Sequence, residues 1–221
     1  MDDKDVAALR KADWNLSITP ESEMHYGHGQ KTSHHVLDQA SLGIDTPWTY
    51  SGDMLTQARM YLQHVRANEY QQVLDAGKAP KRTPMSVDEA FLLLTRQGGL
   101  AVRRPDLGIL QVGAKADIAI FDTRSPNMAG WTNAVAAVVL HANAGDVEGV
   151  LVDGEWRKKG GKLIGVDWQE LRPKFEEVAR RVQRENANLA NEGLGKAEGD
   201  GPMGGMMKWG EPEVFSTKKK M

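Results

Sequence analysis

The chain has 221 residues, a net charge of -2 and no cysteine, with 40% hydrophobic and 26% charged residues. This size is typical of one domain or two small ones, and the near-neutral charge gives no indication of nucleic acid or a membrane as a partner. The lack of cysteine excludes disulfides, thiolate metal ligands and cysteine nucleophiles, and it fits a cytoplasmic setting. No apolar run is long enough to span a bilayer, and the acidic start is unlike a signal peptide.

The amino-terminal part of the sequence begins with a helical pattern and then a strand pattern. Apolar residues at helical spacing predict a helix over Asp5–Ala12, and alternating apolar and polar residues over Trp14–Thr19 predict a strand. Pro20 ends this strand, and a polar loop that carries histidines follows as far as Gly29.

A second unit of the same kind comes next. Ser33–Ala40 predicts a short helix, and Ser41–Ile44 predicts a short strand that ends on Asp45. A long helix is predicted over Asp53–Leu74, capped by Ser51 or by its own first residue. Its predicted apolar face consists of Met54, Leu55, Ala58, Tyr61, Leu62 and Val65.

The second half of the sequence predicts a helix, a small β-unit and a final helix. Ser86 and Glu89 form a capping-box pattern, which starts a helix that ends near Gln97. Short segments rich in branched residues predict strands over 107–110, 118–122, 134–141, 147–152 and 155–157. Asp167–Ala190 predicts an amphipathic helix, and the biased composition from Asn191 onwards predicts disorder.

Asp45 is the first candidate for chemistry, because it directly follows a predicted strand. In parallel β/α architectures the loops after the strand ends form the active site. The alternative is that Asp45 begins the turn before Pro47 or caps the next helix, since aspartate is common before turns. The position in the sequence leaves both explanations open.

The first half resembles the end of the barrel of the amidohydrolase superfamily. The matching segments are Thr19–Met24 (TPESEM), Gly27–Gly29 (GHG), Leu42–Asp45 (LGID) and Ser51–Arg59 (SGDMLTQAR). They are similar to the loop after the seventh strand, the LG-x-D end of the eighth strand and the helix that follows. The resemblance is to the branch of deaminases and chlorohydrolases that act on nucleobases, adenosine-type compounds and triazines.

The second half resembles the same family. Gly108–Asp122 is similar to its G-x-L-x-x-G-x-x-AD-x-x-x-x-D segment, and Val150–Leu163 is similar to its V-x-V-DG hairpin, which ends in G-K-L. The resemblance implies an α/β fold, a partial TIM barrel with a small β-sheet. The implied parts are the last two βα units (1–102) and a segment of the composite β-domain (103–166). The resemblance covers roughly Asp5–Val166, so the amphipathic helix (167–190) and the disordered tail (191–221) are predicted from their own sequence patterns.

The resemblance also assigns a role to Asp45. In the family the eighth-strand aspartate binds catalytic zinc or iron and helps to take a proton from the attacking water, so Asp45 is implied as metal ligand and catalytic residue. The family needs an H-x-H pair and further histidines, which this sequence lacks. Its histidines are His25, His28, His34, His35, His64 and His141. A complete barrel takes about 250 residues, so we expect a fragment that is inactive and binds no metal stably on its own.

Four residues near these loops are candidates for substrate binding: Glu21, Glu23, His28 and Trp48. The two glutamates follow a strand end, and the histidine lies in a family-like Gly-His-Gly. The tryptophan, together with Tyr50, follows Asp45 and would stack on a planar ring. The alternatives are solvated loop side chains and, for Trp48, core packing or a partner contact. His34 and His35 would form a new zinc site only if the fold brought them to a carboxylate, and solvent-facing positions explain them more simply.

Two functions are consistent with these observations. The resemblance implies a hydrolase of carbon–nitrogen bonds other than peptide bonds, by analogy a metal-dependent deaminase of a small heterocyclic substrate. The alternative is a non-catalytic interaction module or truncated remnant that docks on a missing amino-terminal half or on a second copy. Two barrel units leave strand edges and apolar faces uncovered, which favours such docking.

Overall fold

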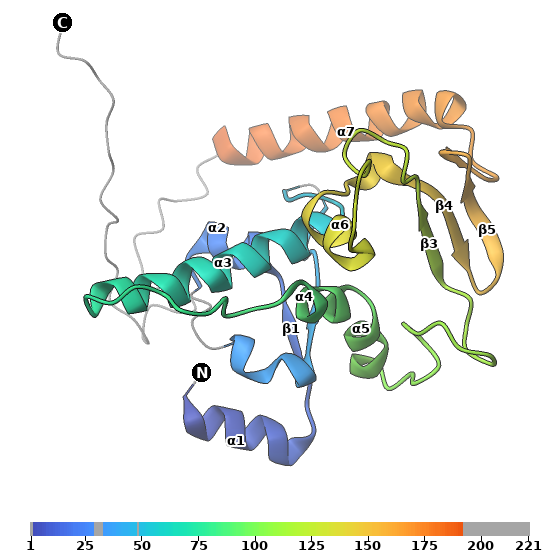
Figure 1. The fold of residues 1–221 in the computed structure, drawn as a ribbon. Helices are drawn as coiled ribbons and strands as arrows, with labels where there is room; N and C mark the ends of the chain where they lie inside the picture. The colour runs from blue at the N-terminus through green and yellow to red at the C-terminus, as the bar shows by residue number, and fades with distance from the viewer. Residues whose placement is uncertain (1, 29–32, 48, 192–221) are drawn as a thin grey trace, which may run out of the picture. The chain divides into compact units, whose positions relative to one another are not determined.

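The computed structural model describes residues 2–28, 33–47 and 49–191 (Figure 1). The chain divides into two compact units, one up to Gly165 and one from Val166 onwards. The first unit contains both sheets, and the second contains one long helix. The tail that was predicted to be disordered lies, from residue 192 on, outside the described residues, and the predicted domain boundaries stay predictions.

Two short parallel strands carry the first part of the chain. The elements in order are α1 (Asp3–Ala12), β1 (Leu16–Ile18), α2 (Pro20–Tyr26), the 3-10 helix η1 (Ser33–Gln39), β2 (Ala40–Leu42) and α3 (Met54–Asp75). β1 pairs with β2 in parallel, with Leu16 opposite Ala40 and Ile18 opposite Leu42. Each strand is followed by a helix, as predicted for two βα units of a barrel. Both loops after the strands therefore leave the same edge of the sheet.

The segment after Pro20 is a helix, so the loop predicted there is wrong. Proline has no N–H to donate, but the first position of a helix needs none, and Pro20 occupies that position. Glu23 accepts hydrogen bonds from the Thr19 backbone N–H at 2.7 Å and from its hydroxyl at 3.2 Å. The helix ends where Gly27 takes a left-handed conformation with φ 67°. Proline thus ends the strand and starts α2.

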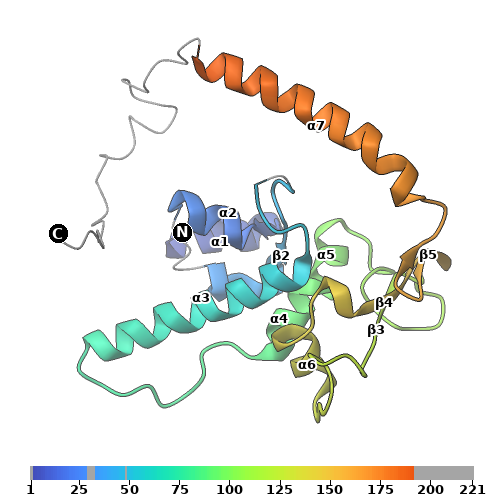
Figure 2. The same ribbon diagram turned by 90° about the horizontal axis from the view of Figure 1, so that it is seen from above.

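Helix α3 covers the parallel strands and organises the core. Asp53 is its N-cap and accepts from the Thr56 N–H at 2.8 Å. The helix packs against α2, β2, α4 and α6, as the two views show (Figures 1 and 2). The fully or almost fully buried residues of this core are Ile18, Ala40, Tyr61, Leu62, Val65, Met85, Ala90, Leu93 and Val139. The predicted apolar face of α3 omits Gln57, which is also completely buried.

The helix predicted to run from Ser86 to Gln97 is two helices. α4 (Val87–Leu94) has the predicted capping box, and α5 (Arg96–Ala101) follows a break at Thr95. Gly108 lies against this break, with φ 70°, and a Cβ there would stand 2.5 Å from the Thr95 carbonyl oxygen. The segment predicted as a strand over 107–110 packs on this break instead of joining a sheet.

The second sheet has four antiparallel strands in the order β3-β4-β5-β6. They are β3 (Ile118–Phe121), β4 (Val147–Val152), β5 (Glu155–Lys159) and β6 (Lys162–Leu163), with a 3-10 turn η2 (Ala144–Asp146) before β4. The strand predicted over 134–141 is wrong, because Ala134–Leu140 forms helix α6. Asn133 caps it by accepting from the Ala136 N–H at 2.9 Å, and Ala137 and Val139 are buried.

The second unit contains α7 (Trp168–Asn191), close to the predicted helix. Intrahelical ion pairs stabilise it, such as Arg172 with Glu176 and Lys174 with Glu170. Across the ranges 2–28, 33–47 and 49–191, every helix is too short or too polar to cross a membrane.

Candidate active site

Asp45 lies in the loop that follows β2, at the carboxyl edge of the parallel pair. It is exposed and has a left-handed backbone with φ 73°. The Ser22 hydroxyl, from the third residue of α2, donates to Asp45 Oδ2 at 2.6 Å. Ser22 is buried, and its bond to Asp45 joins helix α2, which follows β1, to the loop that follows β2. The carboxylate is thus oriented while it still faces solvent.

Glu21, predicted to contact substrate, is held within the protein. It accepts hydrogen bonds from the Ser51 N–H at 2.8 Å, from the Ser51 hydroxyl and from Gln57 Nε2 at 2.9 Å. Gln57 Oε1 accepts in return from the Glu21 N–H at 3.2 Å. The bond from the Ser51 hydroxyl is the main reason why the pKa of Glu21 is lowered. Glu21 therefore ties α2 to the loop before α3, and its substrate role stays a prediction.

The remaining predicted contacts lie near this edge. Glu23 caps α2 through Thr19. His28 is exposed and stacks on Tyr26, with ring centroids 5.7 Å apart, and Tyr26 meets Tyr50 edge-on at 6.4 Å. Trp48 lies outside the described residues. The substrate roles of Glu23, His28 and Trp48 stay predictions.

Ser22 and Gln57 were not predicted as site residues, whereas Tyr50 was considered together with Trp48 as a ring for stacking on a planar substrate. Tyr50 is buried, and its hydroxyl oxygen and Thr46 Oγ1 have no hydrogen-bond partner among the described residues. Burial is the main reason why the pKa of Tyr50 is raised. The only signal in the sequence was the closeness of Tyr50 and Thr46 to Asp45, whereas Gln57 was hidden because it is a polar residue on an apolar helix face.

The donor atoms near Asp45 do not fit a complete zinc centre. Catalytic zinc sites normally use three protein ligands, and in the described part of the chain no three histidine, aspartate or glutamate side chains gather to hold a metal. Asp45 has a serine hydroxyl as its neighbour. His34 instead approaches Glu69, with Nε2 and Oε1 3.3 Å apart, and His64 contacts Asn68 at 2.9 Å.

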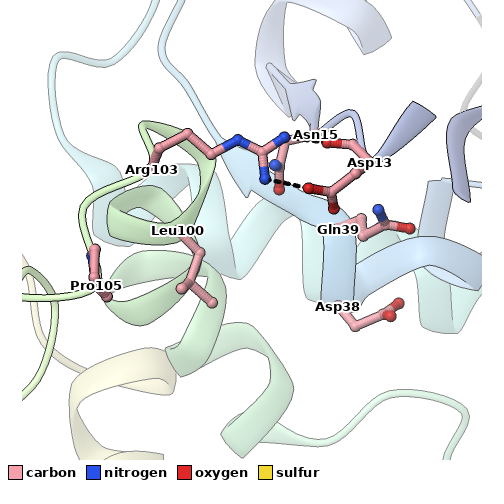
Figure 3. A pocket seen from close by; sticks show the side chains of 7 residues that line it. All are labelled: Asp13, Asn15, Asp38, Gln39, Leu100, Arg103 and Pro105. Atoms are coloured by element: carbon pink, nitrogen blue, oxygen red, sulfur yellow. Dashed lines mark hydrogen bonds and ion pairs between the residues drawn. The ribbon is translucent and has the colours of Figure 1, made fainter. Parts of the chain in front are cut away.

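A hollow lies elsewhere, at the amino edge of the same strands (Figure 3). Its volume is about 360 Å³, and it is lined by Asp13, Asn15, Asp38, Gln39, Leu100, Arg103 and Pro105. Arg103 reaches across it to Asp13, with Nη1 and Oδ2 2.6 Å apart. Asp45 is not among the lining residues, so the candidate active site is an open edge of two strands.

Residues 10–157 match the Amidohydrolase family. The chain belongs to this family. A 5-methylthioadenosine/S-adenosylhomocysteine deaminase from Pelotomaculum thermopropionicum is 26% identical over 183 residues, which cover 82% of this chain and 41% of the relative. The chain thus spans about two fifths of the length of the curated relative it matches.

Solved structures of the family share the fold. An adenosine deaminase from Xanthomonas campestris with bound zinc superposes with a TM-score of 0.71 at 17% identity, over 83% of this chain and 41% of that one. A variant of an atrazine chlorohydrolase from Arthrobacter aurescens, complexed with zinc and atraton, gives a TM-score of 0.60 at 19% identity, over 72% and 34%. The family and the partial-barrel fold predicted from the motifs are confirmed, and the family is one with a metal cofactor.

Proposed function

We propose that this chain forms the Asp45 edge of a metal-dependent deaminase that acts on a small heterocyclic substrate, such as an adenosine derivative. The reaction class would be hydrolysis of a carbon–nitrogen bond other than a peptide bond. The observation that carries the proposal is the position of Asp45 after the carboxyl end of β2, where Ser22 from helix α2 orients it. The names of the relatives support the substrate class.

We further propose that the chain is inactive alone and binds neither zinc nor iron stably. The donor set near Asp45 supports this, because one carboxylate and a hydroxyl do not hold a catalytic ion. The other ligands would come from a partner, either an amino-terminal half of the barrel or a second copy. β1 and β2 form a sheet of two strands within the described residues, and such a pair is marginal without neighbours.

Zinc titration by calorimetry, together with a 5-methylthioadenosine deamination assay, tests these proposals. The isolated chain is expected to show neither stoichiometric binding nor turnover. Addition of the amino-terminal half of a related deaminase should give zinc binding and turnover, and Asp45→Asn should abolish the turnover while Asp53→Asn leaves it. Tight zinc binding with turnover by the isolated chain would contradict the inactivity, and a mixed complex as active with Asp45→Asn as without it would contradict the role of Asp45.

An interaction module is the second candidate function, because α7 exposes an apolar stripe. The stripe consists of Trp168, Leu171, Phe175, Val178 and Val182, each between 45% and 56% exposed. Their spacing of three and four residues is typical of a helix that packs on another helix. Size-exclusion chromatography with light scattering tests this: Val178→Glu should disperse an assembly that Glu177→Gln leaves intact. A compact monomer of the unchanged chain would contradict docking between copies.

The cytoplasmic location stays a prediction.

A further inference from the structure

A second cavity, of about 320 Å³, lies at the amino edge of the parallel strands. The residues that the argument uses are His34, Leu37, Asp38, Glu89, Leu92 and Gln97, all of which line it. They come from η1, α4 and α5, and η1 runs directly into the start of β2. Because Asp45 follows the other end of β2, this cavity is separate from the candidate active site.

Two residues on its walls carry a buried polar atom that has no hydrogen-bond partner among the described residues: Nδ1 of His34 and Oε1 of Gln97. Leaving a buried polar atom unpaired is energetically unfavourable, and nearly all such atoms in folded proteins are paired. Two of them on residues that line one cavity therefore indicate that a polar molecule completes this region. Both atoms are buried in this structure, so binding requires each side chain to turn its free atom toward that molecule.

The chemistry of the two atoms defines what they need. His34 Nε2 lies 3.3 Å from Glu69 Oε1, which places the ring proton on Nε2 and leaves Nδ1 as an acceptor. Burial lowers the pKa of His34, and the neighbouring His35 lowers it further, so the neutral ring is favoured. The side-chain oxygen of Gln97 is also an acceptor. Both atoms therefore require an N–H or O–H donor.

The other walls narrow the class of molecule. The Glu89 carboxylate, which is bonded to Ser86, borders the cavity and favours a cation over a neutral donor. Asp38 also borders the cavity, but its charge is paired with Arg10. Leu37 and Leu92 supply an apolar surface. We propose that this cavity binds a small organic cation with N–H donors on an apolar body, such as an aralkyl ammonium ion. Its volume lies within the usual range for small-molecule sites.

The test uses benzylammonium as the probe and the full chain as the protein. Nuclear magnetic resonance would follow the His34 ring nitrogens and the Gln97 side-chain amide during the titration, with benzyl alcohol as a neutral probe of matched shape. A saturable shift of both groups is expected with benzylammonium, with at least fivefold weaker binding of benzyl alcohol. Gln97→Met should weaken benzylammonium binding at least fivefold. Gln71→Met is the matched control, because Gln71 lies exposed on α3 and bonds to Asp75.

Three results would overturn the proposal. They are a shift that does not saturate, equal binding of the two probes, and unchanged binding by Gln97→Met. Circular dichroism shows whether Gln97→Met folds; if it does not, Gln97→Glu, which keeps an acceptor at this position, decides. That variant should retain saturable binding, and its failure to shift the His34 ring would count against the site. Zinc binding and turnover at the Asp45 edge have no bearing on this outcome.

Discussion

The two edges of the β1–β2 pair hold their carboxylates in different ways. At the carboxyl edge, Glu21 accepts hydrogen bonds from Ser51 and Gln57, and Asp45 accepts one from Ser22, all of them buried or half-buried neutral groups. At the amino edge, charges are paired with arginine at the surface, as in the pair of Arg10 with Asp38. The strength of a hydrogen bond from a partly buried neutral donor depends mainly on its geometry, whereas the strength of an exposed ion pair depends on the salt concentration. The side chains at the edge that carries Asp45 are therefore held in more fixed positions than those at the amino edge.

The largest effect is expected from Gln57→Leu. Gln57 is fully buried and makes two hydrogen bonds to Glu21. Leucine at this position leaves the Glu21 N–H without its acceptor and removes one donor from the Glu21 carboxylate. We expect the free energy of unfolding in urea to fall by about 2–3 kcal/mol. Gln63→Leu, on the exposed side of the same helix, should change it by less than about 0.5 kcal/mol. If the two variants lowered the free energy of unfolding equally, the buried hydrogen bonds of Gln57 would not distinguish the carboxyl edge from the amino edge.

A smaller effect is expected from Ser22→Ala. The variant removes the hydrogen bond to an exposed carboxylate, so we expect a loss of about 1 kcal/mol in the same urea experiment. In addition, the Asp45 side chain should become more mobile, which carbon relaxation measurements would detect. Ser17→Ala, on the exposed side of β1, is the control. An Asp45 side chain that is as rigid without the serine hydroxyl as with it would show that Ser22 does not orient it.

The pH dependence should reveal the Glu21 network. The pKa of Glu21 in the folded protein is lowered, chiefly by the hydrogen bond from the Ser51 hydroxyl. The ionised Glu21 therefore stabilises the fold at pH values above its ordinary pKa of 4.5, and this stabilisation is lost as the pH falls through the folded pKa. Glu21→Gln should therefore flatten the decline of stability below pH 4.5, measured by thermal unfolding. An acid decline as steep in Glu21→Gln as in the unchanged chain would contradict this.

The smallest effect is expected at the amino edge. Arg10→Gln removes an exposed ion pair with Asp38, and surface pairs contribute little. Any fall in melting temperature at low salt should vanish at about 1 M sodium chloride, where the screening length is only about 3 Å. The effect of Gln57→Leu should persist at that salt concentration. A persistent loss in Arg10→Gln would mean that the two edges do not differ in kind.

Local patterns predicted the parts of this fold that local physics determines. The N-cap Asp53, the apolar face around Leu62 and the capping box at Ser86 are all as expected. The motif ending on Asp45 placed that residue correctly after the second strand. In these places the chemistry of a few adjacent residues sufficed.

The predictions were wrong or incomplete where contacts between residues far apart in the sequence determine the structure. The valine-rich segment 134–141 has the composition of a strand, but its apolar side chains pack on α3 and α4 and its Asn133 cap starts a helix. The Ser22–Asp45 bond joins residues 23 positions apart, and the Glu21–Gln57 pair spans 36 positions. Neither spacing has a sequence signature. Contacts between residues so far apart in the sequence depend on how the strands align, and no single segment of the sequence determines that alignment.

The left-handed backbone at Asp45 has a consequence for how this position changes over generations. Only glycine, asparagine and aspartate adopt φ near 73° at little cost. Of these three, aspartate alone offers an ionised carboxylate. Once selection for that charge ends, drift to asparagine or glycine is nearly free of backbone strain, whereas glutamate is not. The identity of residue 45 across a set of related genes is thus a simple indicator of which copies still depend on the charge.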